Sequence, residues 1–194
     1  QYDDATGAVV LPAEMEIDLG SVAKGYAGQL AAQMLRNSGV ESALLNLGGN
    51  VQTVGAKPGG FPWQIGIKDP QGEDAMMVLS VEDQAVVTSG GYERYFEQDG
   101  QTYWHIMDPS TGHPADSGLI SVTIVGDEGV VCDGLSTALF VMGLEKAADL
   151  WAQSCDFEAV FVTASGEVYI TEGLRDRFAL TEQYADTPVS VIER

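Results

Sequence analysis

The sequence has few positively charged residues. Its 194 residues include 9 Lys and Arg against 29 Asp and Glu, which gives a net charge of −20. No stretch is basic enough to displace counterions from phosphates, so a nucleic acid is excluded as a partner. The acidic composition is typical of a solvated shell that keeps a protein soluble. A small polyanionic ligand would therefore need a metal ion or one of the few Lys and Arg residues.

Long apolar runs and cysteines are also scarce. No run approaches the ~20 apolar residues that span a bilayer, which predicts soluble material. Nothing near Cys132 or Cys155 has the spacing of a zinc site; we expect two buried free thiols, with a disulfide as the open alternative. The sequence opens on Gln1 and shows no signal segment, so we expect the natural start of the protein to lie upstream.

The hydrophobic pattern predicts short strands with two or three helices between them. Val22, Tyr26, Leu30 and Met34 recur every four positions, which is typical of an amphipathic helix, and Ser21 is its expected N-cap. Two further helices are expected at residues 130–142 and 145–154. Strands are expected at residues 9–11, 16–19, 42–47, 51–55, 63–68, 76–81, 85–88, 92–97, 103–107, 119–125, 159–163 and 168–171, before a polar tail after residue 181. Strand pairs outnumber β-α-β units, so the predicted fold class is α+β, with antiparallel sheets in a single domain over residues 1–194.

Two predicted helix starts could bind an anion and a metal. Residues 18–26 pass from a strand through a glycine into a helix, whose N-terminus suits a phosphate, and Lys24 lies in the first turn. Asp133 and Thr137 are four positions apart, so their oxygens share one helix face. A carboxylate and a hydroxyl are ligands for Mg²⁺ rather than zinc. An ordinary connection and a helix-dipole partner are the structural alternatives.

Two further segments could carry chemistry. His105 lies in residues 103–112, and an imidazole that titrates near pH ~6.5 is a natural proton acceptor. His113, in the following turn, has a weaker claim. Thr88 and Ser89 precede two glycines that would let a ligand approach the backbone, so we expect them to contact a cofactor. A structural histidine and a plain strand break remain open alternatives.

Five motifs occur in a characteristic order: residues 17–26 (Ile-Asp-Leu-Gly-Ser-Val-Ala-Lys-Gly-Tyr), 46–50 (Asn-Leu-Gly-Gly-Asn), 88–90 (Thr-Ser-Gly), 105–112 (His-Ile-Met-Asp-Pro-Ser-Thr-Gly) and 133–138 (Asp-Gly-Leu-Ser-Thr-Ala). Their order and spacing over residues 18–143 resemble the ApbE family of FAD:protein FMN transferases, whose fold is related to the T-fold. The resemblance implies Mg²⁺-dependent transfer of FMN from FAD to a threonine hydroxyl of a target flavoprotein, with release of AMP. FAD pyrophosphatase activity and a catalytically incomplete flavin-binding module are the alternatives.

The resemblance also implies residue roles. His105 and Asp133 would be the catalytic residues, and Asp133, Thr137 and the backbone carbonyl of Ser21 would bind Mg²⁺. The residues implied at FAD are Asp18, Lys24 and Met107, beside Thr88 and Ser89.

Three expectations concern the rest of the protein. Residues 3–9 resemble the family's target signature, but Val9 stands where the acceptor hydroxyl would be, so we expect a hairpin turn there. Family members carry a longer portion before this point, which this chain lacks. They usually work outside the cytoplasm and are often lipid-anchored, which implies an extracytoplasmic location and a possible membrane anchor in the full-length protein.

Overall fold

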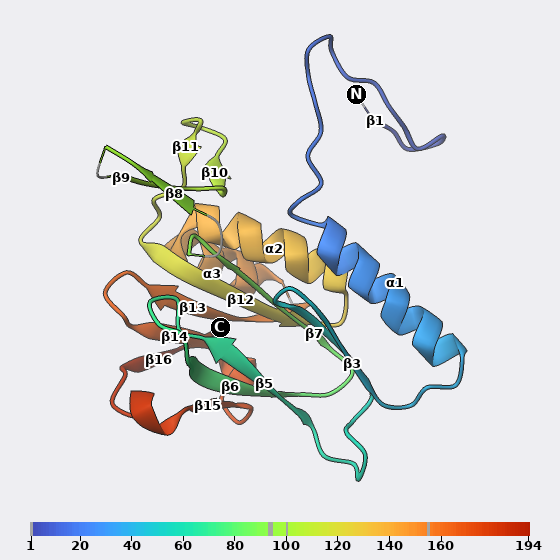
Figure 1. The fold of residues 1–194 in the computed structure, drawn as a ribbon, viewed down its shortest axis with the longest axis vertical. Coiled ribbons are helices and arrows are strands. Elements are labelled where there is room, and N and C mark those ends of the chain that lie inside the picture. Colours follow the sequence, from blue (N-terminus) through green and yellow to red (C-terminus); the bar gives the residue numbers. More distant parts are fainter. Residues whose placement is uncertain (1, 93–94, 100, 155) are drawn as a thin grey trace.

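The computed structural model describes residues 2–92, 95–99, 101–154 and 156–194, with only the backbone at residues 101 and 102 (Figure 1). Cys155 lies outside the described residues. The helices are α1 (Ala23–Asn37), α2 (Gly129–Met142) and α3 (Leu144–Gln153), with short 3-10 turns at Glu172–Leu174 and Glu182–Tyr184. None of the helices among these residues is long and apolar enough to cross a membrane.

The strands form one large sheet, one small sheet and three hairpins. The large sheet has the order β16-β14-β13-β12-β7-β4-β3, and all neighbours in it are antiparallel except β14 and β16. Its strands are β3 (Ala43–Leu47), β4 (Asn50–Val54), β7 (Ala85–Gly90), β12 (Leu119–Gly126), β13 (Phe157–Thr163), β14 (Val168–Thr171) and β16 (Val189–Ile192). The small sheet joins β5 (Trp63–Lys68), β6 (Ala75–Val81) and β15 (Phe178–Leu180). The hairpins are β1 (Tyr2–Asp3) with β2 (Ala8–Val9), β8 (Tyr95–Gln98) with β9 (Gln101–Trp104), and β10 (Met107–Asp108) with β11 (His113–Pro114).

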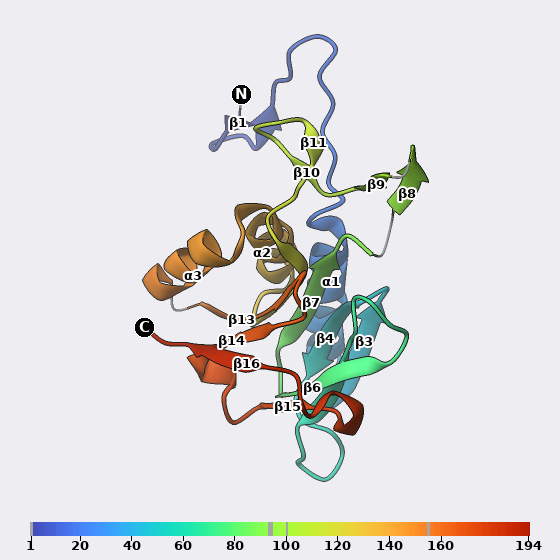
Figure 2. The ribbon, with the colours of Figure 1, turned by 90° about the vertical axis from the view of Figure 1, so that its left-hand side faces the viewer.

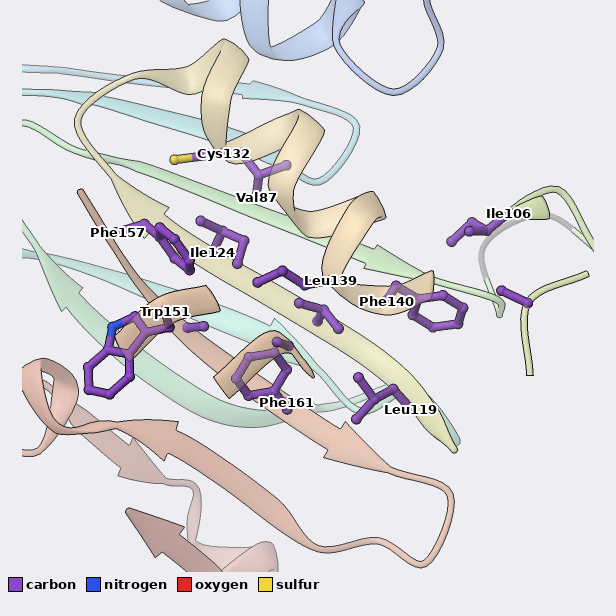
Figure 3. Close-up of a cluster of buried hydrophobic side chains, with 14 of the residues drawn as sticks. Val87, Ile106, Leu119, Ile124, Cys132, Leu139, Phe140, Trp151, Phe157 and Phe161 are labelled. Carbon is purple, nitrogen blue, oxygen red and sulfur yellow. The ribbon is translucent and has the colours of Figure 1, made fainter. Parts of the chain in front are cut away.

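The central strands of the large sheet are buried on both faces, because the three helices cover one face and the small sheet covers the other (Figures 1 and 2). Side chains alternate along each strand, so Val87 and Ile124 point to the helices while Val86 and Val125 point to the small sheet. Figure 3 shows the helix-side core, in which Leu139 and Phe140 of α2 and Trp151 of α3 pack over the sheet. This arrangement confirms the predicted α+β class.

Helix α1 occurs where the pattern predicts it, but it buries its small residues. Gly25, Gly28 and Ala32 are buried, whereas Tyr26 is 57% and Met34 69% exposed. The apolar stripe of the predicted amphipathic helix therefore faces outward. The reason is the close approach of α1 to α2 and β4, which only a face without large side chains permits. The predicted cap is also wrong, because α1 has its N-cap at Val22 and no side-chain cap hydrogen bond.

The two ends of the chain differ from expectation as well. Residues 16–19 form no strand, and the segment before α1 is exposed and extends away from the body of the protein (Figure 1). The expected turn over residues 3–9 is confirmed by the β1–β2 hairpin. The polar tail contains β16, which pairs in parallel with β14 at the sheet edge. An edge strand needs hydrogen-bonding partners more than apolar side chains, so composition did not reveal it.

Cys132 at the start of α2 confirms half of the thiol prediction, since it is free and 1% exposed. Burial raises the pKa of its thiol to about 12, and the nearby carboxylates of Asp127 and Asp133 add to the rise. In a Cys155→Ser variant at pH ~8.5, we expect Cys132 to react with iodoacetamide about 10³-fold more slowly in the folded protein than in guanidinium, where a thiol has its ordinary pKa of about 8.5. Mass spectrometry measures both rates. Similar rates would contradict the buried position.

Candidate functional site

The contact between α1 and α2 brings together the first and the last of the five motifs, residues 17–26 and 133–138. The backbone N–H of Gly25 donates a buried hydrogen bond of 2.7 Å to Oδ2 of Asp133. A Cβ atom on Gly25 would overlap the carbonyl oxygen of Gly129 and lie 2.6 Å from Cβ of Asp133. Gly134 approaches the other side of the contact, because a Cβ atom there would lie 3.5 Å from Cγ1 of Val22. The residues that flank Ser21 and Lys24 therefore lie against the first turns of α2.

Asp133 is the most buried acidic group of this contact, with 4% of its surface exposed. Burial raises the pKa of its carboxyl, whereas the Gly25 N–H, the charge of Lys24 and the amide of Asn50 act in the opposite direction. Burial outweighs these three groups, so the carboxylate is incompletely compensated by its protein surroundings. Such a group is suited to receive a cation.

Lys24 lies between the carboxylate and the glycine turn that connects β3 to β4. Its Nζ atom donates a hydrogen bond of 3.3 Å to the carbonyl oxygen of Gly48. Gly48 and Gly49 have φ values of 62° and 87°, a left-handed backbone that favours glycine, and Oδ1 of Asn46 accepts a hydrogen bond from the Gly49 N–H. The motif at residues 46–50 thus forms one wall of the site.

Asn50 is a site residue that the sequence did not reveal. It is fully buried at the start of β4, and Nε2 of Gln52 donates to its Oδ1 at 3.4 Å. Its Nδ2 atom forms no hydrogen bond of ordinary geometry with the described residues, although the amide favours the ionised form of Asp133. A buried asparagine next to a buried carboxylate would have been a usable signal, but the burial of both was not visible in the sequence.

A cluster of hydroxyl groups adjoins Asp133 on α2. Oγ of Ser89 lies 2.7 Å from Oγ of Ser136 and 3.2 Å from Oγ1 of Thr137. Ser136 is fully buried and was not among the predicted residues. The structure therefore brings Ser89 of β7 together with Asp133 and Thr137.

The side chain of Thr88 points to the opposite face of β7 from that of Ser89. Its Oγ1 pairs with Oγ1 of Thr123 at 2.8 Å, and adjacent side chains of a strand lie on opposite faces. The structure thus separates Thr88 from the α2 hydroxyl cluster, and its predicted contact with a cofactor stays a prediction.

Asp18 precedes α1, and the His105 segment lies toward the Phe140 end of α2. Asp18 is exposed in the segment before α1, where its Oδ1 accepts a hydrogen bond from the Gly20 N–H. His105 and Met107 are exposed on either side of the buried Ile106. Figure 3 shows Ile106 beside the end of α2 that carries Phe140, whereas Cys132, next to Asp133, lies at its other end. Asp133 and Phe140 are two helical turns apart, or about 10 Å, so Ile106 and Asp133 lie toward opposite ends of α2.

An apolar pocket of about 320 Å³ lies at the Phe140 end of α2. Its walls include the rings of Trp104, Tyr92 and Phe140 and the backbone of Gly91. A Cβ atom on Gly91 would lie 2.9 Å from the Trp104 indole, whose Nε1 is held by the carbonyl of Ala115. This pocket has the size and the aromatic lining that suit a planar ring system.

The residues at the start of α2 fit a magnesium ion. Within the described ranges, no group of three or more His, Cys, Asp or Glu side chains could hold a metal by itself. Mg²⁺ usually takes only one or two protein carboxylates and completes its shell with neutral oxygens and substrate phosphates. The Asp133 carboxylate and the Thr137 hydroxyl supply such hard oxygens, and Ser21 lies in the segment packed beside them.

The glycine contact gives a stability prediction. Gly25→Ala should lower the free energy of unfolding by about 1–3 kcal/mol, because the added methyl group overlaps the backbone of α2. Gly134→Ala is the matched control. Its methyl group meets only an ordinary contact and should stabilise the helix by up to about 1 kcal/mol. Urea unfolding measures both, and equal effects of the two variants would contradict the close contact.

Comparison with known proteins places these residues in context. A family model described as the ApbE family matches residues 2–161. An FAD:protein FMN transferase of Klebsiella pneumoniae (strain 342) is 42% identical over 180 residues, which cover 91% of this chain and 55% of that protein. One of Treponema pallidum (strain Nichols) is 40% identical over 175 residues, covering 85% and 48%.

Solved structures agree with these matches. The crystal structure of the ApbE protein from Thermotoga maritima matches with a TM-score of 0.84 at 38% identity, covering 91% of this chain and 58% of that one. The flavin transferase ApbE from Vibrio cholerae matches with a TM-score of 0.74 at 30% identity, covering 84% and 53%. The chain thus spans about half the length of the curated relatives that it matches.

Proposed function

The chain belongs to the ApbE family, and from this premise we propose that it carries out the Mg²⁺-dependent transfer of FMN from FAD to a threonine hydroxyl of a target flavoprotein, releasing AMP. The observation that carries the proposal is the buried Asp133 carboxylate, fixed by the Gly25 N–H one helical turn from Thr137. The names of the relatives support flavin transfer, and the oxygen donors support the choice of metal.

The main requirement of this reaction is to neutralise charge, because an oxygen nucleophile must approach a pyrophosphate in a protein of net charge −20. A bound Mg²⁺ would polarise the phosphoryl group and stabilise the departing AMP. Asp133, Thr137 and the Ser21 carbonyl would hold it. Lys24, one of nine basic residues, would add a second positive charge from the first turn of α1.

The remaining predicted residues would act on the threonine nucleophile or contact FAD. His105 would accept the proton of the threonine hydroxyl, a step that contributes typically ~10²–10⁴-fold. Its exposed position leaves room for a protein acceptor to approach. The aromatic pocket beside Phe140 would take a ring of FAD, and Met107 and Asp18 would line the dinucleotide. An extracytoplasmic, membrane-anchored location of the full-length protein belongs to the same proposal and rests on family resemblance alone.

A second candidate is hydrolysis of FAD to FMN and AMP. The exposure of His105 favours it, since water could reach the same base. A flavin-binding module without catalysis is the third, favoured by the aromatic pocket beside Phe140, which could hold a ring without any chemistry.

One assay separates these functions. The chain is incubated with FAD, MgCl₂ and a flavoprotein domain that carries a threonine acceptor motif, and the acceptor is weighed by intact-protein mass spectrometry. Transfer predicts an acceptor heavier by one FMN moiety, free AMP, and no product with EDTA or with an acceptor whose threonine is replaced by valine. Free FMN and AMP without any acceptor would indicate the pyrophosphatase. FAD binding without either product would support the third candidate, a flavin-binding module without catalysis.

A further inference from the structure

The hydroxyl cluster behind Asp133 forms a chain of hydrogen bonds. Oγ of Ser136 lies 2.8 Å from the backbone carbonyl of Asp133, one turn earlier in α2. Oγ of Ser89 follows at 2.7 Å, and Oγ1 of Thr137 lies 3.2 Å from Ser89. Thr137 also lies 3.5 Å from the Asp133 carbonyl. Ser136 is fully buried, and Ser89 reaches the helix from β7, so the chain connects the sheet to the metal-binding face of α2.

The direction of every proton in this chain follows from its first member. Ser136 donates its single proton to the carbonyl oxygen of Asp133, which can only accept. Ser136 can then only accept from Ser89, which therefore donates its own proton to Ser136. Ser89 in turn can only accept from Thr137. The Ser89 hydroxyl and the Asp133 carbonyl, which both lie within hydrogen-bonding distance of Thr137, thus accept its proton rather than donate one.

Thr137 consequently turns its proton toward the protein and keeps lone pairs for another partner. A hydroxyl in this state can bind a cation but cannot donate to a phosphate. With the proton rotated outward, the same oxygen would present a positive hydrogen to the ion and bind it poorly. The orientation of one proton therefore determines whether Thr137 is a metal ligand.

We propose that Ser136 and Ser89 are positioning residues that orient the Thr137 hydroxyl as an acceptor for a divalent cation. The inference rests on the proposed function for the metal itself, and adds two residues to its site. It gives Ser89 a role different from the cofactor contact that the sequence suggested. It also gives a reason for Ser136, which no ligand could touch in its buried position.

The test measures metal binding without catalysis. Mn²⁺ prefers the same oxygen ligands as Mg²⁺ and can be titrated by electron paramagnetic resonance. A hydrogen bond contributes about 0.5–1.5 kcal/mol, so Ser136→Ala should weaken Mn²⁺ binding roughly 2–10-fold, and Ser89→Ala should do the same. The double variant should be no weaker than either single variant, because each substitution breaks the same chain. Competition with MgCl₂ checks that both ions use one site.

Two control variants make the outcome decisive. Ser117→Ala removes a hydroxyl that donates to the carbonyl of Phe140 at the other end of α2, and it should leave Mn²⁺ affinity unchanged. Asp133→Asn should abolish binding. If Asp133→Asn abolishes binding while Ser136→Ala and Ser89→Ala bind as the wild type does, or if their effects add, the positioning role is wrong and the metal site stands. If Asp133→Asn binds Mn²⁺ normally, the metal site of the proposed function fails and the positioning role fails with it.

Discussion

Replacing Asp133 by asparagine is expected to lower flavin transfer by on the order of 10²–10³-fold or more, with no loss of stability. The substitution keeps the shape of the side chain and an oxygen that can accept from the Gly25 N–H, but it removes the negative charge. If this charge holds the cation of the proposed reaction, its loss removes transition-state stabilisation of this size. Initial rates at limiting Mg²⁺ measure the effect, with AMP as the product.

The stability of this variant distinguishes function from structure. Because burial raises the pKa of Asp133, its ionised form is unfavourable in the folded protein without metal, and asparagine removes that cost. Urea unfolding in EDTA at pH ~7 should therefore show equal or greater stability. Asp127→Asn, an exposed carboxylate just before α2, is the matched control and should keep full activity. If Asp133→Asn stays fully active at limiting Mg²⁺, Asp133 is only a partner for the α1 backbone.

The second large effect concerns His105. His105→Gln should lower turnover by ~10²-fold or more while FAD affinity survives, because glutamine keeps polarity and size but cannot accept the proton. The loss should be found in kcat rather than in KM, since the interaction matters in the transition state. For the wild type, kcat should fall at acid pH, because a protonated imidazole cannot accept the proton of the threonine hydroxyl. The variant should lose this dependence.

His113 provides the control for this experiment. It lies in β11 of the hairpin that begins two residues after His105, and it is also exposed. His113→Gln should leave kcat and its pH profile unchanged. If His105→Gln weakens FAD binding or lowers the Tm while turnover is kept, the base must be another group. Asp108 is a poor replacement, because hydrogen bonds from Ser110 lower the pKa of its carboxyl.

The sequence alone was enough to predict the class of fold and the family. Alternation along β5 and β6 and the pattern of residues 130–142 were enough to predict an antiparallel α+β fold, because these signals are local. The four-residue spacing of Asp133 and Thr137 likewise placed two oxygens on one helix face before any tertiary contact was known. The order of five motifs indicated the family.

Only the tertiary structure decided which faces and which neighbours those residues have. Tyr26 and Met34 mark an apolar stripe, yet α1 turns Gly25 and Gly28 inward because α2 and Gln52 approach too closely for larger side chains. Thr88 and Ser89 are adjacent in the sequence but lie on opposite faces of β7. The face on which a residue lies depends on strand register and helix separation, which arise from contacts between segments that are distant in the sequence.

Asn50 and Ser136 illustrate the same limit at the site. Each is a common polar residue whose identity carries little information, and each gains a role only by being buried against Asp133 or Ser89. Burial makes a hydrogen bond obligatory, and an obligatory hydrogen bond fixes the orientation of its neighbour. A sequence specifies which groups can donate and accept hydrogen bonds. The packing of α1, α2 and β7 determines which of these groups are buried and must therefore form a hydrogen bond.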